Sequence, residues 1–165
     1  MRYSLCNHWE FTEQWSDAFC RGEPVGCRPV RLPHTCRELP LHYADPSDYE
    51  MVCGYRRTLT VPDAPRVFLR IDGAAHQAEI YLNGQLAGQH QGGYTGFTIE
   101  ITDLVHRGTE NLLAVRLDTR EDPSLPPFGF VIDYLTYGGL YREVWLETSP
   151  QSRVSDLFVY TPTLT

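Results

Sequence analysis

The amino-acid sequence predicts an all-β fold, a jelly-roll β-sandwich. Apolar and polar residues alternate in short runs bounded by turn-forming residues, which is typical of half-buried antiparallel strands. The chain contains 12 prolines and 13 glycines, and only one short segment has a helical pattern. Long loops between some of the seven or eight expected strands, and tight hairpins between others, favour a jelly roll.

The expected strands follow one another along the chain after residue 54. Asn83-Gly84 is the strongest short hairpin signal, and Thr102–His106 predicts a short helical turn that closes near Gly108. Residues 21–54 lack periodicity and are expected to form a long ordered loop. The alternating apolar residues are Leu59 and Val61; Val67, Leu69 and Ile71; Ala78, Ile80 and Leu82; Phe97, Ile99 and Ile101; Leu113, Val115 and Leu117; and Val144 and Leu146.

The domain organisation is predicted from a change in pattern near the end of the sequence. Residues 1–148 are expected to form the jelly roll, and residues 149–153 have the composition of a linker. Val154–Tyr160 then begins another alternating run. From the pattern alone this run is either the first strand of a second domain or the last strand of the same sheet.

Composition excludes several classes of function. The chain has 165 residues and a formal net charge of −7, and all 14 basic residues are arginines. Without lysine there is no Schiff-base chemistry and no Walker-type phosphate loop. An acidic chain without a basic cluster is not expected to bind nucleic acid or an anionic membrane. No apolar run approaches the ~20 residues of a membrane helix, and the first residues lack a signal-peptide pattern.

The cysteines and histidines do not form a metal-binding pattern. The number of cysteines is odd and no two are spaced C-x-x-C, which predicts reduced thiols and a cytoplasmic location. Cys20 and Cys27 are too isolated for a zinc site, and the six histidines are scattered. The five cysteines are Cys6, Cys20, Cys27, Cys36 and Cys53.

Asp133 and the aromatic residues each have two interpretations. Asp133 lies among apolar neighbours, where an unpaired charge is costly; from these residues alone, a turn cap or a pair with Arg142 is favoured over a functional role. Aromatic rings either stack on sugar rings or fill the core and interfaces. The aromatic residues considered are Trp9, Trp15, Tyr43, Tyr94, Tyr134, Tyr137 and Trp145.

Several ordered motifs carry a family resemblance. Tyr137–Glu147, with the sequence YGGLYREVWLE, resembles the signature that closes the N-terminal sugar-binding domain of glycoside hydrolase family 2. This family includes β-galactosidases, β-glucuronidases and β-mannosidases. The resemblance covers residues 3 to 160, and motifs in the right order are more specific than any single one. The other matching segments are Val30–His34, Gly54–Pro62, Ala78–Gly84, Gly92–Tyr94 and Asn111–Arg116.

The resemblance implies a galactose-binding-domain-like jelly roll that an immunoglobulin-like domain and a (β/α)₈ barrel follow in the same polypeptide. Residues 149–165 would then lead into the immunoglobulin-like domain. In the family the barrel carries the acid/base and nucleophile glutamates of a retaining mechanism. Catalytic residues are therefore expected beyond Thr165, and the chain alone is expected to be inactive and to hold no cofactor. The expected substrate is a β-galactoside or related β-glycoside. The full-length protein is expected to be either a monomer or a homo-oligomer.

The resemblance also implies two site residues. In the family's β-galactosidases, an Asp nine positions before the Arg of the closing signature contacts sugar hydroxyls and helps to hold a sodium ion. That position is Asp133 here, so the functional interpretation of Asp133 becomes the favoured one. A carboxylate can accept hydrogen bonds from hydroxyls and ligate a hard cation. A second sugar contact of the family is an Asn, and its place is occupied by His42, which is either a sugar contact or a plain loop histidine.

Three hypotheses about function follow. The leading one is the N-terminal domain of a β-glycosidase, most like a β-galactosidase, that shapes the glycone subsite of a separate barrel. The alternative is a stand-alone, non-catalytic carbohydrate-binding module. The third is a structural domain used for oligomer contacts, because a fold does not imply a function.

Overall fold

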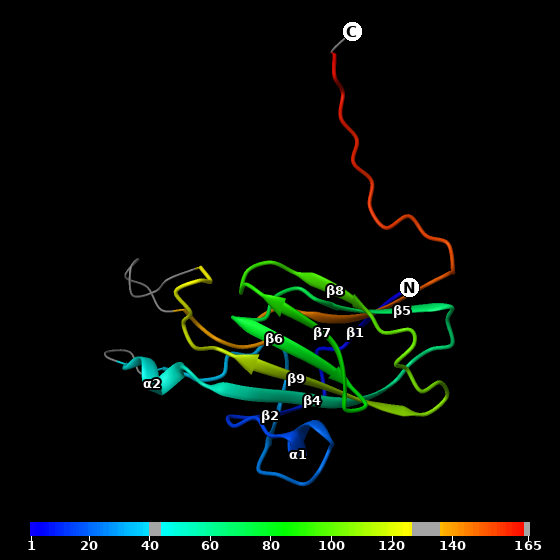
Figure 1. Cartoon of the computed structure of the whole chain (residues 1–165). Helices are drawn as coiled ribbons and strands as arrows, with labels where there is room; N and C mark the ends of the chain where they lie inside the picture. The colour runs from blue at the N-terminus through cyan, green and yellow to red at the C-terminus, as the bar shows by residue number, and fades with distance from the viewer. Residues whose placement is uncertain (40–43, 127–135, 164–165) are drawn as a thin grey trace.

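The computed structural model describes residues 1–39, 44–126 and 136–163 (Figure 1). Strands dominate these residues, and two single-turn helices accompany them. The strands are β1 (Arg2–Ser4), β2 (Trp9–Thr12), β3 (Arg28–Val30), β4 (Val52–Thr60), β5 (Arg66–Ile71), β6 (Gln77–Leu82), β7 (Gln85–Gln91), β8 (Phe97–Glu100), β9 (Glu110–Asp118) and β10 (Val144–Ser149); the helices are α1 (Asp17–Cys20) and α2 (Pro46–Tyr49).

The strands form two antiparallel sheets that pack face to face. One sheet has four strands in the order β1-β10-β5-β8, and the other has six in the order β3-β2-β4-β9-β6-β7. The longest pairing joins β4 and β9, from Val52 opposite Asp118 to Thr60 opposite Glu110. This arrangement confirms the prediction of an all-β sandwich.

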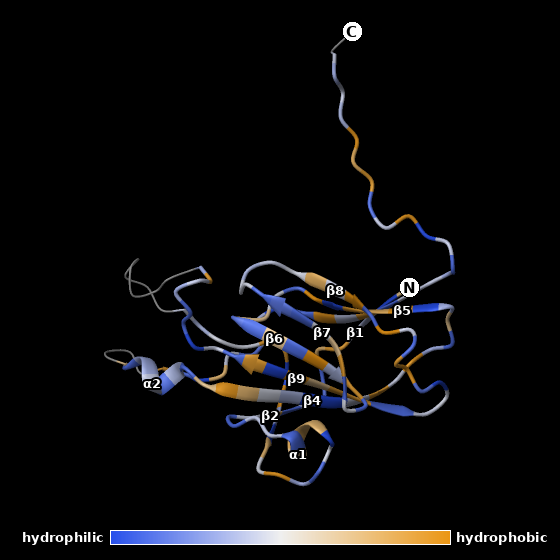
Figure 2. Cartoon of the chain, in the orientation of Figure 1, coloured by the Kyte–Doolittle hydropathy of each residue, from blue (hydrophilic) through white to orange (hydrophobic). Residues whose placement is uncertain are grey.

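The core lies between the two sheets, where every second residue of each strand points inward. Apolar and polar residues accordingly alternate along β6 (Figure 2), as half-buried strands require. Burying one large apolar side chain contributes about 1.5–3 kcal/mol. The largest fully buried side chains are Trp9, Tyr55, Phe11, Phe19, Leu69, Ile71, Ile80, Leu82, Ile101, Leu113, Leu117 and Leu140.

The hairpin between β6 and β7 turns at Asn83-Gly84, as predicted. Both residues have positive φ, 52° and 79°, which suits the two-residue turns that asparagine and glycine favour. The Asn83 side chain also joins the hairpin to its surroundings. Its Nδ2 donates to the Leu104 carbonyl (3.1 Å) and to Asn111 Oδ1 (2.9 Å), and its Oδ1 accepts from the Leu112 N–H (2.9 Å). Asn83 therefore couples the hairpin to the start of β9.

Three local predictions differ from the structure. Residues 102–104 form a turn with a hydrogen bond from the Leu104 N–H to the Ile101 carbonyl (3.0 Å), not a helix. The expected long loop at 21–54 contains β3, α2 and the start of β4. Neither helix was predicted, because a single turn is too short to show a helical period.

Helix α1 covers part of the outer face of the six-stranded sheet. Ser16 caps the helix by accepting from the Phe19 N–H (3.2 Å), which lets Phe19 pack flat over Gly54. The Arg56 guanidinium lies 4.5 Å from the centroid of the Phe19 ring. Trp15, just before the helix, stacks on Tyr81 of β6 with centroids 5.5 Å apart. Both ends of α1 are thus attached to the sheet through aromatic contacts.

Residues 150–163 leave the sandwich and contain no helix or strand (Figure 1). Val154, Phe158 and Tyr160 are 81%, 84% and 70% exposed, and apolar segments are visible along this tail in Figure 2. Pairing of Val154–Tyr160 with the sandwich is not observed, and its entry into a following domain stays a prediction. None of the helices among the described residues is long and apolar enough to cross a membrane.

The contact between Phe19 and Gly54 yields a test of the packing of α1. A Cβ atom at position 54 would lie 2.8 Å from the Phe19 ring and 3.0 Å from Thr12 Cγ2. Gly54→Ala should lower the free energy of unfolding by about 1–3 kcal/mol, because both neighbours must move. Gly26→Ala is the control, since nothing lies within 4 Å of its Cβ position. Equal urea midpoints for the two variants would contradict this account.

The Asn83 contacts yield a second test. Asn83→Ala removes three hydrogen bonds and places a Cβ-bearing residue without a polar group at positive φ, so the free energy of unfolding should fall by at least about 2 kcal/mol. Asn83→Gly loses the same bonds but tolerates the backbone conformation, so it should cost less. Urea unfolding of both variants checks the order; a glycine variant as unstable as the alanine variant would refute the role of the backbone.

Candidate functional site

One end of the sandwich collects most of its long connections. Asp118 at the end of β9 lies opposite Val52 and Gln77, and Ile71 at the end of β5 lies opposite Phe97 and Val144. The segments before or after these residues therefore emerge at the same end, on the left of Figure 1. We call the described residues of these segments the loop end; they are 44–51, 72–76, 92–96, 119–126 and 136–143. Residues 31–39 are included, because the His34 and Cys36 N–H groups donate to the Leu140 and Gly138 carbonyls.

Asp133 and His42, the two predicted sugar contacts, lie outside the described residues. The same holds for the predicted role of Asp133 as a sodium ligand, and all three remain predictions. The described residues on both sides of each position belong to the loop end. These flanking residues hold the ends of the two segments that contain the predicted site.

Gly138 and Gly139 hold the segment after Asp133 in a narrow space. The Gly139 carbonyl accepts from the Ala75 N–H (3.1 Å), and the Gly138 carbonyl accepts from the Cys36 N–H (3.0 Å). Gly139 has a φ of 140°, and a Cβ atom there would collide with the His34 carbonyl oxygen. A Cβ at Gly138 would collide with the Thr119 side chain. Two glycines are required here because three other chain segments approach this backbone closely.

Thr119 ties the segment before Asp133 to the start of β4. Its N–H donates to the Met51 carbonyl (2.9 Å), and its hydroxyl oxygen accepts from the Met51 N–H (2.9 Å). The same hydroxyl lies 3.1 Å from the Tyr49 carbonyl, to which it donates. A buried hydroxyl with this many partners fixes both segments, since leaving any of these groups unpaired costs about 1–3 kcal/mol.

Thr136 and Glu121 connect the two flanks of residues 127–135. The buried Thr136 hydroxyl donates to Glu121 Oε1 (2.8 Å), and the Glu121 N–H donates to Glu50 Oε1 (3.2 Å). The flanks are thus joined to one another and to the segment that leads from α2 to β4. Both flanks of residues 127–135 therefore belong to one hydrogen-bonded frame.

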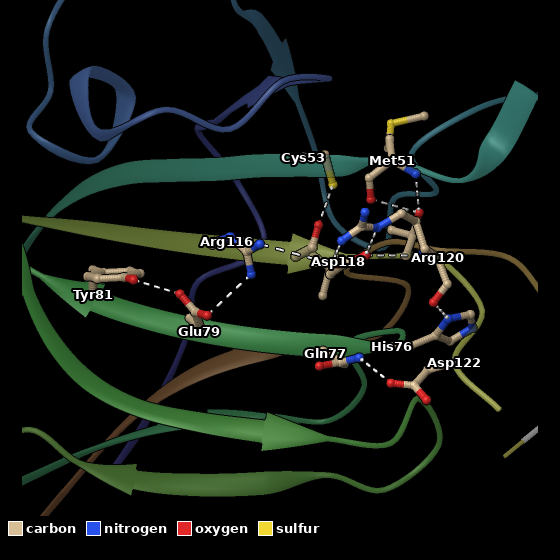
Figure 3. A network of polar contacts seen from close by, with 12 residues as sticks. Met51, Cys53, His76, Gln77, Glu79, Tyr81, Arg116, Asp118, Arg120 and Asp122 are labelled. Atoms are coloured by element: carbon tan, nitrogen blue, oxygen red, sulfur yellow. Dashed lines mark hydrogen bonds and ion pairs between the residues drawn. The ribbon is translucent and has the colours of Figure 1, made fainter. Parts of the chain in front are cut away.

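Asp118, the residue just before the loop-end segment 119–126, has several charged contacts (Figure 3). Arg120 donates to it from Nε (2.9 Å), from Nη2 (2.5 Å) and from its backbone N–H (3.1 Å). Burial by itself would raise the pKa of Asp118, but these hydrogen bonds and the charges of Arg120 and Arg116 outweigh it and lower the pKa. The His76 N–H donates to the Asp118 carbonyl (3.0 Å). Asp118 is therefore an ionised anchor for the turn that follows β9.

His34 anchors the segment that leads toward position 42. Its Nδ1 lies 2.8 Å from the hydroxyl oxygen of the buried Tyr55. Burial lowers the pKa of His34, and the nearby Arg28 charge lowers it further. The Cys36 thiol lies 3.6 Å from the same Tyr55 hydroxyl and 3.3 Å from the buried Cys53 thiol. All five cysteines are free. His34 thus acts as a neutral hydrogen-bonding group in the frame.

Two tyrosines of the loop end present their rings to solvent. Tyr94 is 55% exposed and Tyr137 is 52% exposed. The Tyr94 backbone is held, because its carbonyl accepts from Arg142 Nη1 (3.1 Å) and the preceding Gly93 carbonyl accepts from the Tyr141 hydroxyl. Rings of this kind can pack on the apolar face of a sugar.

The other aromatic residues considered from the sequence have different surroundings. Trp9 is in the core, Trp15 stacks on Tyr81, and Trp145 lies under the Arg2 guanidinium at 3.9 Å. Tyr43 and Tyr134 lie outside the described residues. Only Tyr94 and Tyr137 among the described members of this set offer a largely exposed ring.

Sequence reasoning did not find the polar frame of Thr119, Glu121 and Thr136. Their contacts join residues 15, 68, 70 and 71 positions apart in sequence, so no local spacing signals them. Among the described residues no group of three or more His, Cys, Asp or Glu side chains could hold a metal ion. The described part of the loop end therefore offers hydrogen-bonding groups and two aromatic rings.

Comparison with known proteins identifies the family. Residues 30–150 match the model of the sugar-binding domain of glycosyl hydrolases family 2. A β-galactosidase from Thermoanaerobacter pseudethanolicus is 38% identical over 133 residues, 78% of this chain and 18% of that protein. A β-glucuronidase from Bacteroides fragilis is 35% identical over 162 residues, 96% of this chain and 22% of that protein.

Solved structures agree with these matches. A crystal structure of Bacteroides uniformis β-glucuronidase superposes with a TM-score of 0.77 at 31% identity, over 88% of this chain and 17% of that chain. The chain spans about a fifth of the length of the curated relatives it matches. The ordered motifs around Tyr137–Glu147, the two-sheet sandwich and these matches agree: the chain belongs to glycoside hydrolase family 2 and has the fold of its sugar-binding domain.

Proposed function

We propose that the chain is the N-terminal sugar-binding domain of a retaining β-glycosidase, and that its loop end shapes the glycone subsite of a catalytic barrel in the same polypeptide. The family match supports this proposal, and so do relatives named β-galactosidase and β-glucuronidase. In this arrangement the glutamates of the barrel perform the chemistry. The domain described here contributes binding and orientation of the sugar.

The observation that carries the proposal is the hydrogen-bonded frame on both sides of residues 127–135. Thr136 and Glu121 join the two flanks; the Thr119 side chain lies against Gly138, and the backbone of residues 34–36 lies against Gly139. A binding residue must be held closely in place to orient a substrate, because small displacements cost much of the rate. A frame of this kind is suited to present Asp133 at the sugar.

Each predicted residue has a defined role in the proposal. Asp133 accepts hydrogen bonds from sugar hydroxyls and supplies a carboxylate oxygen to a sodium ion, which would neutralise its charge and help to orient the sugar. His42 makes a second hydroxyl contact. Tyr94 and Tyr137 offer rings to the less polar faces of the substrate. None of these groups exchanges a covalent bond with the sugar.

β-Galactosides are the substrate class that we propose first. Two relatives named β-galactosidase match at 38% and 37% identity, and a β-glucuronidase at 35% supplies the competing class. The competing function is a stand-alone carbohydrate-binding module, which the two exposed tyrosines also favour. Saturable shifts of the Tyr94 and Tyr137 ring signals, when methyl β-galactoside is added to the 165-residue chain, would support the module.

The first test concerns Asp133. In the full-length protein, Asp133→Asn should lower kcat/KM for nitrophenyl β-galactoside about 10- to 100-fold, because hydrogen bonds to a charged group are worth about 1.5–3 kcal/mol. The melting temperature should stay close to that of the wild type. Asp103→Asn is the matched control, because Asp103 is an exposed residue at the opposite end of the sandwich. Unchanged kcat/KM in Asp133→Asn would remove this residue from the site.

The second test separates the chain from the whole protein. The full-length protein should hydrolyse nitrophenyl β-galactoside with a higher kcat/KM than nitrophenyl β-glucuronide. The 165-residue chain should hydrolyse neither substrate, because both catalytic glutamates are proposed to lie in the barrel. A higher kcat/KM for the glucuronide would correct the substrate class, and hydrolysis by the chain alone would overturn the proposed division of roles.

A further inference from the structure

The outer face of the six-stranded sheet is divided into a covered and an open half. Helix α1 and Trp15 cover the half around Gly54 and Arg56. Over β6, β7 and β9 a hollow of about 500 Å³ is left open, a size within the range of small-molecule sites. The residues that line it are Gln77, Ala78, Glu79, Gln89, His90, Gln91 and Arg116.

Glu79 and Arg116 form a fixed polar centre in the hollow. Glu79 accepts a hydrogen bond from the Tyr81 hydroxyl (2.6 Å) and another from Arg116 Nη1 (3.2 Å), and Arg116 Nη2 lies 4.0 Å from Asp118 (Figure 3). Burial and this carboxylate raise the pKa of Tyr81 to about 12. Because these side chains stand on adjacent strands and hold one another, their positions are set before any ligand arrives.

Three glutamine amides surround this centre. Gln77 Nε2 donates to Asp122 Oδ2 (3.3 Å), while Gln89 and Gln91 on β7 are exposed. Gln91 lies opposite Gln77, and Gln89 lies opposite Glu79. Each amide can donate and accept hydrogen bonds at once. The hollow therefore offers hydrogen-bond donors and acceptors close to the Glu79 carboxylate and the Arg116 guanidinium.

The charges around the hollow select a neutral ligand. Arg116 is balanced by Glu79 and Asp118, and Arg120 is paired with Asp118. An anionic ligand would be repelled by the carboxylates of Glu79 and Asp122. The guanidinium groups of Arg116 and Arg120 already have carboxylate partners. A compound with many hydroxyl groups and no charge fits better, because each hydroxyl both donates and accepts, as the amides do.

We propose that this hollow binds a neutral sugar unit of an oligosaccharide. All the residues that line the site belong to β6, β7 and β9, and Gln77 and Gln91 adjoin His76 and Gly92 of the loop end. The polar row from Gln77 to Tyr81 extends over about 13 Å of strand. The inference therefore goes beyond the proposed glycone subsite, since it adds a non-catalytic contact on the face of the sheet.

Side-chain amide signals provide a direct test with the 165-residue chain. Addition of lactose should shift the ¹⁵N–¹H signals of Gln89 and Gln91 along a saturable curve. The signal of Gln85, on the same strand but outside the hollow, should not move. Sodium glucuronate at the same concentrations should produce smaller shifts, because its carboxylate is repelled.

Variants then assign the binding to these residues. The double variant Gln89→Ala/Gln91→Ala should weaken lactose binding about tenfold, as expected for the loss of two neutral hydrogen bonds. Gln85→Ala should bind as tightly as the wild type. Both variants replace exposed side chains and should keep the wild-type melting temperature.

Three results would overturn the proposal. These are static Gln89 and Gln91 signals at the highest soluble lactose concentration, unchanged affinity in the double variant, or stronger binding of glucuronate than of lactose. None of these results depends on hydrolysis by the full-length protein. Failure of the hollow and failure of the proposed glycosidase function are therefore distinguishable, since activity with nitrophenyl β-galactoside and Asp133→Asn report only on the latter.

Discussion

The close approach of backbones at Gly138 and Gly139 is the constraint on which the loop end depends. The Thr119 side chain at Gly138, and the His34 carbonyl and Thr35 Cα at Gly139, occupy space that a side chain would need. Close packing leaves little freedom, because interiors are as dense as organic crystals. The glycine pair thus lets the segment after residue 135 form backbone hydrogen bonds with His34, Cys36 and Ala75, and so holds these loops together.

The register of the strands determines where the candidate site lies. Because β4, β9 and β6 are antiparallel and in register, the end of β9 lies beside the beginnings of the other two strands. Connections from distant parts of the chain therefore emerge at one end. Binding residues are often carried on loops that a rigid scaffold positions, and here Thr119, Glu121 and Thr136 supply the links between scaffold and loops.

The two faces of the six-stranded sheet have different physical characters. Its inner face is apolar and closes the core, whereas its outer face combines the aromatic contacts of α1 with the polar row from Glu79 to Asp118. This row is stable because each charge has a partner, and a buried or half-buried charge without one is costly. The same pairing leaves the uncharged amides as the groups most available for a ligand.

The sequence by itself determined the all-β class, most strands after residue 54, the Asn83-Gly84 hairpin and the family, because period-2 alternation, turn chemistry and ordered motifs are local signals. It did not reveal the two short helices, and it predicted a helical turn at Thr102–His106 where residues 102–104 form a non-helical turn, because such segments are shorter than one clear period. Only the tertiary structure decided which segments share the loop end, why Gly138 and Gly139 are required, and that Gln89 and Gln91 stand beside Glu79. These features depend on contacts between residues far apart in sequence, and such contacts leave no local pattern.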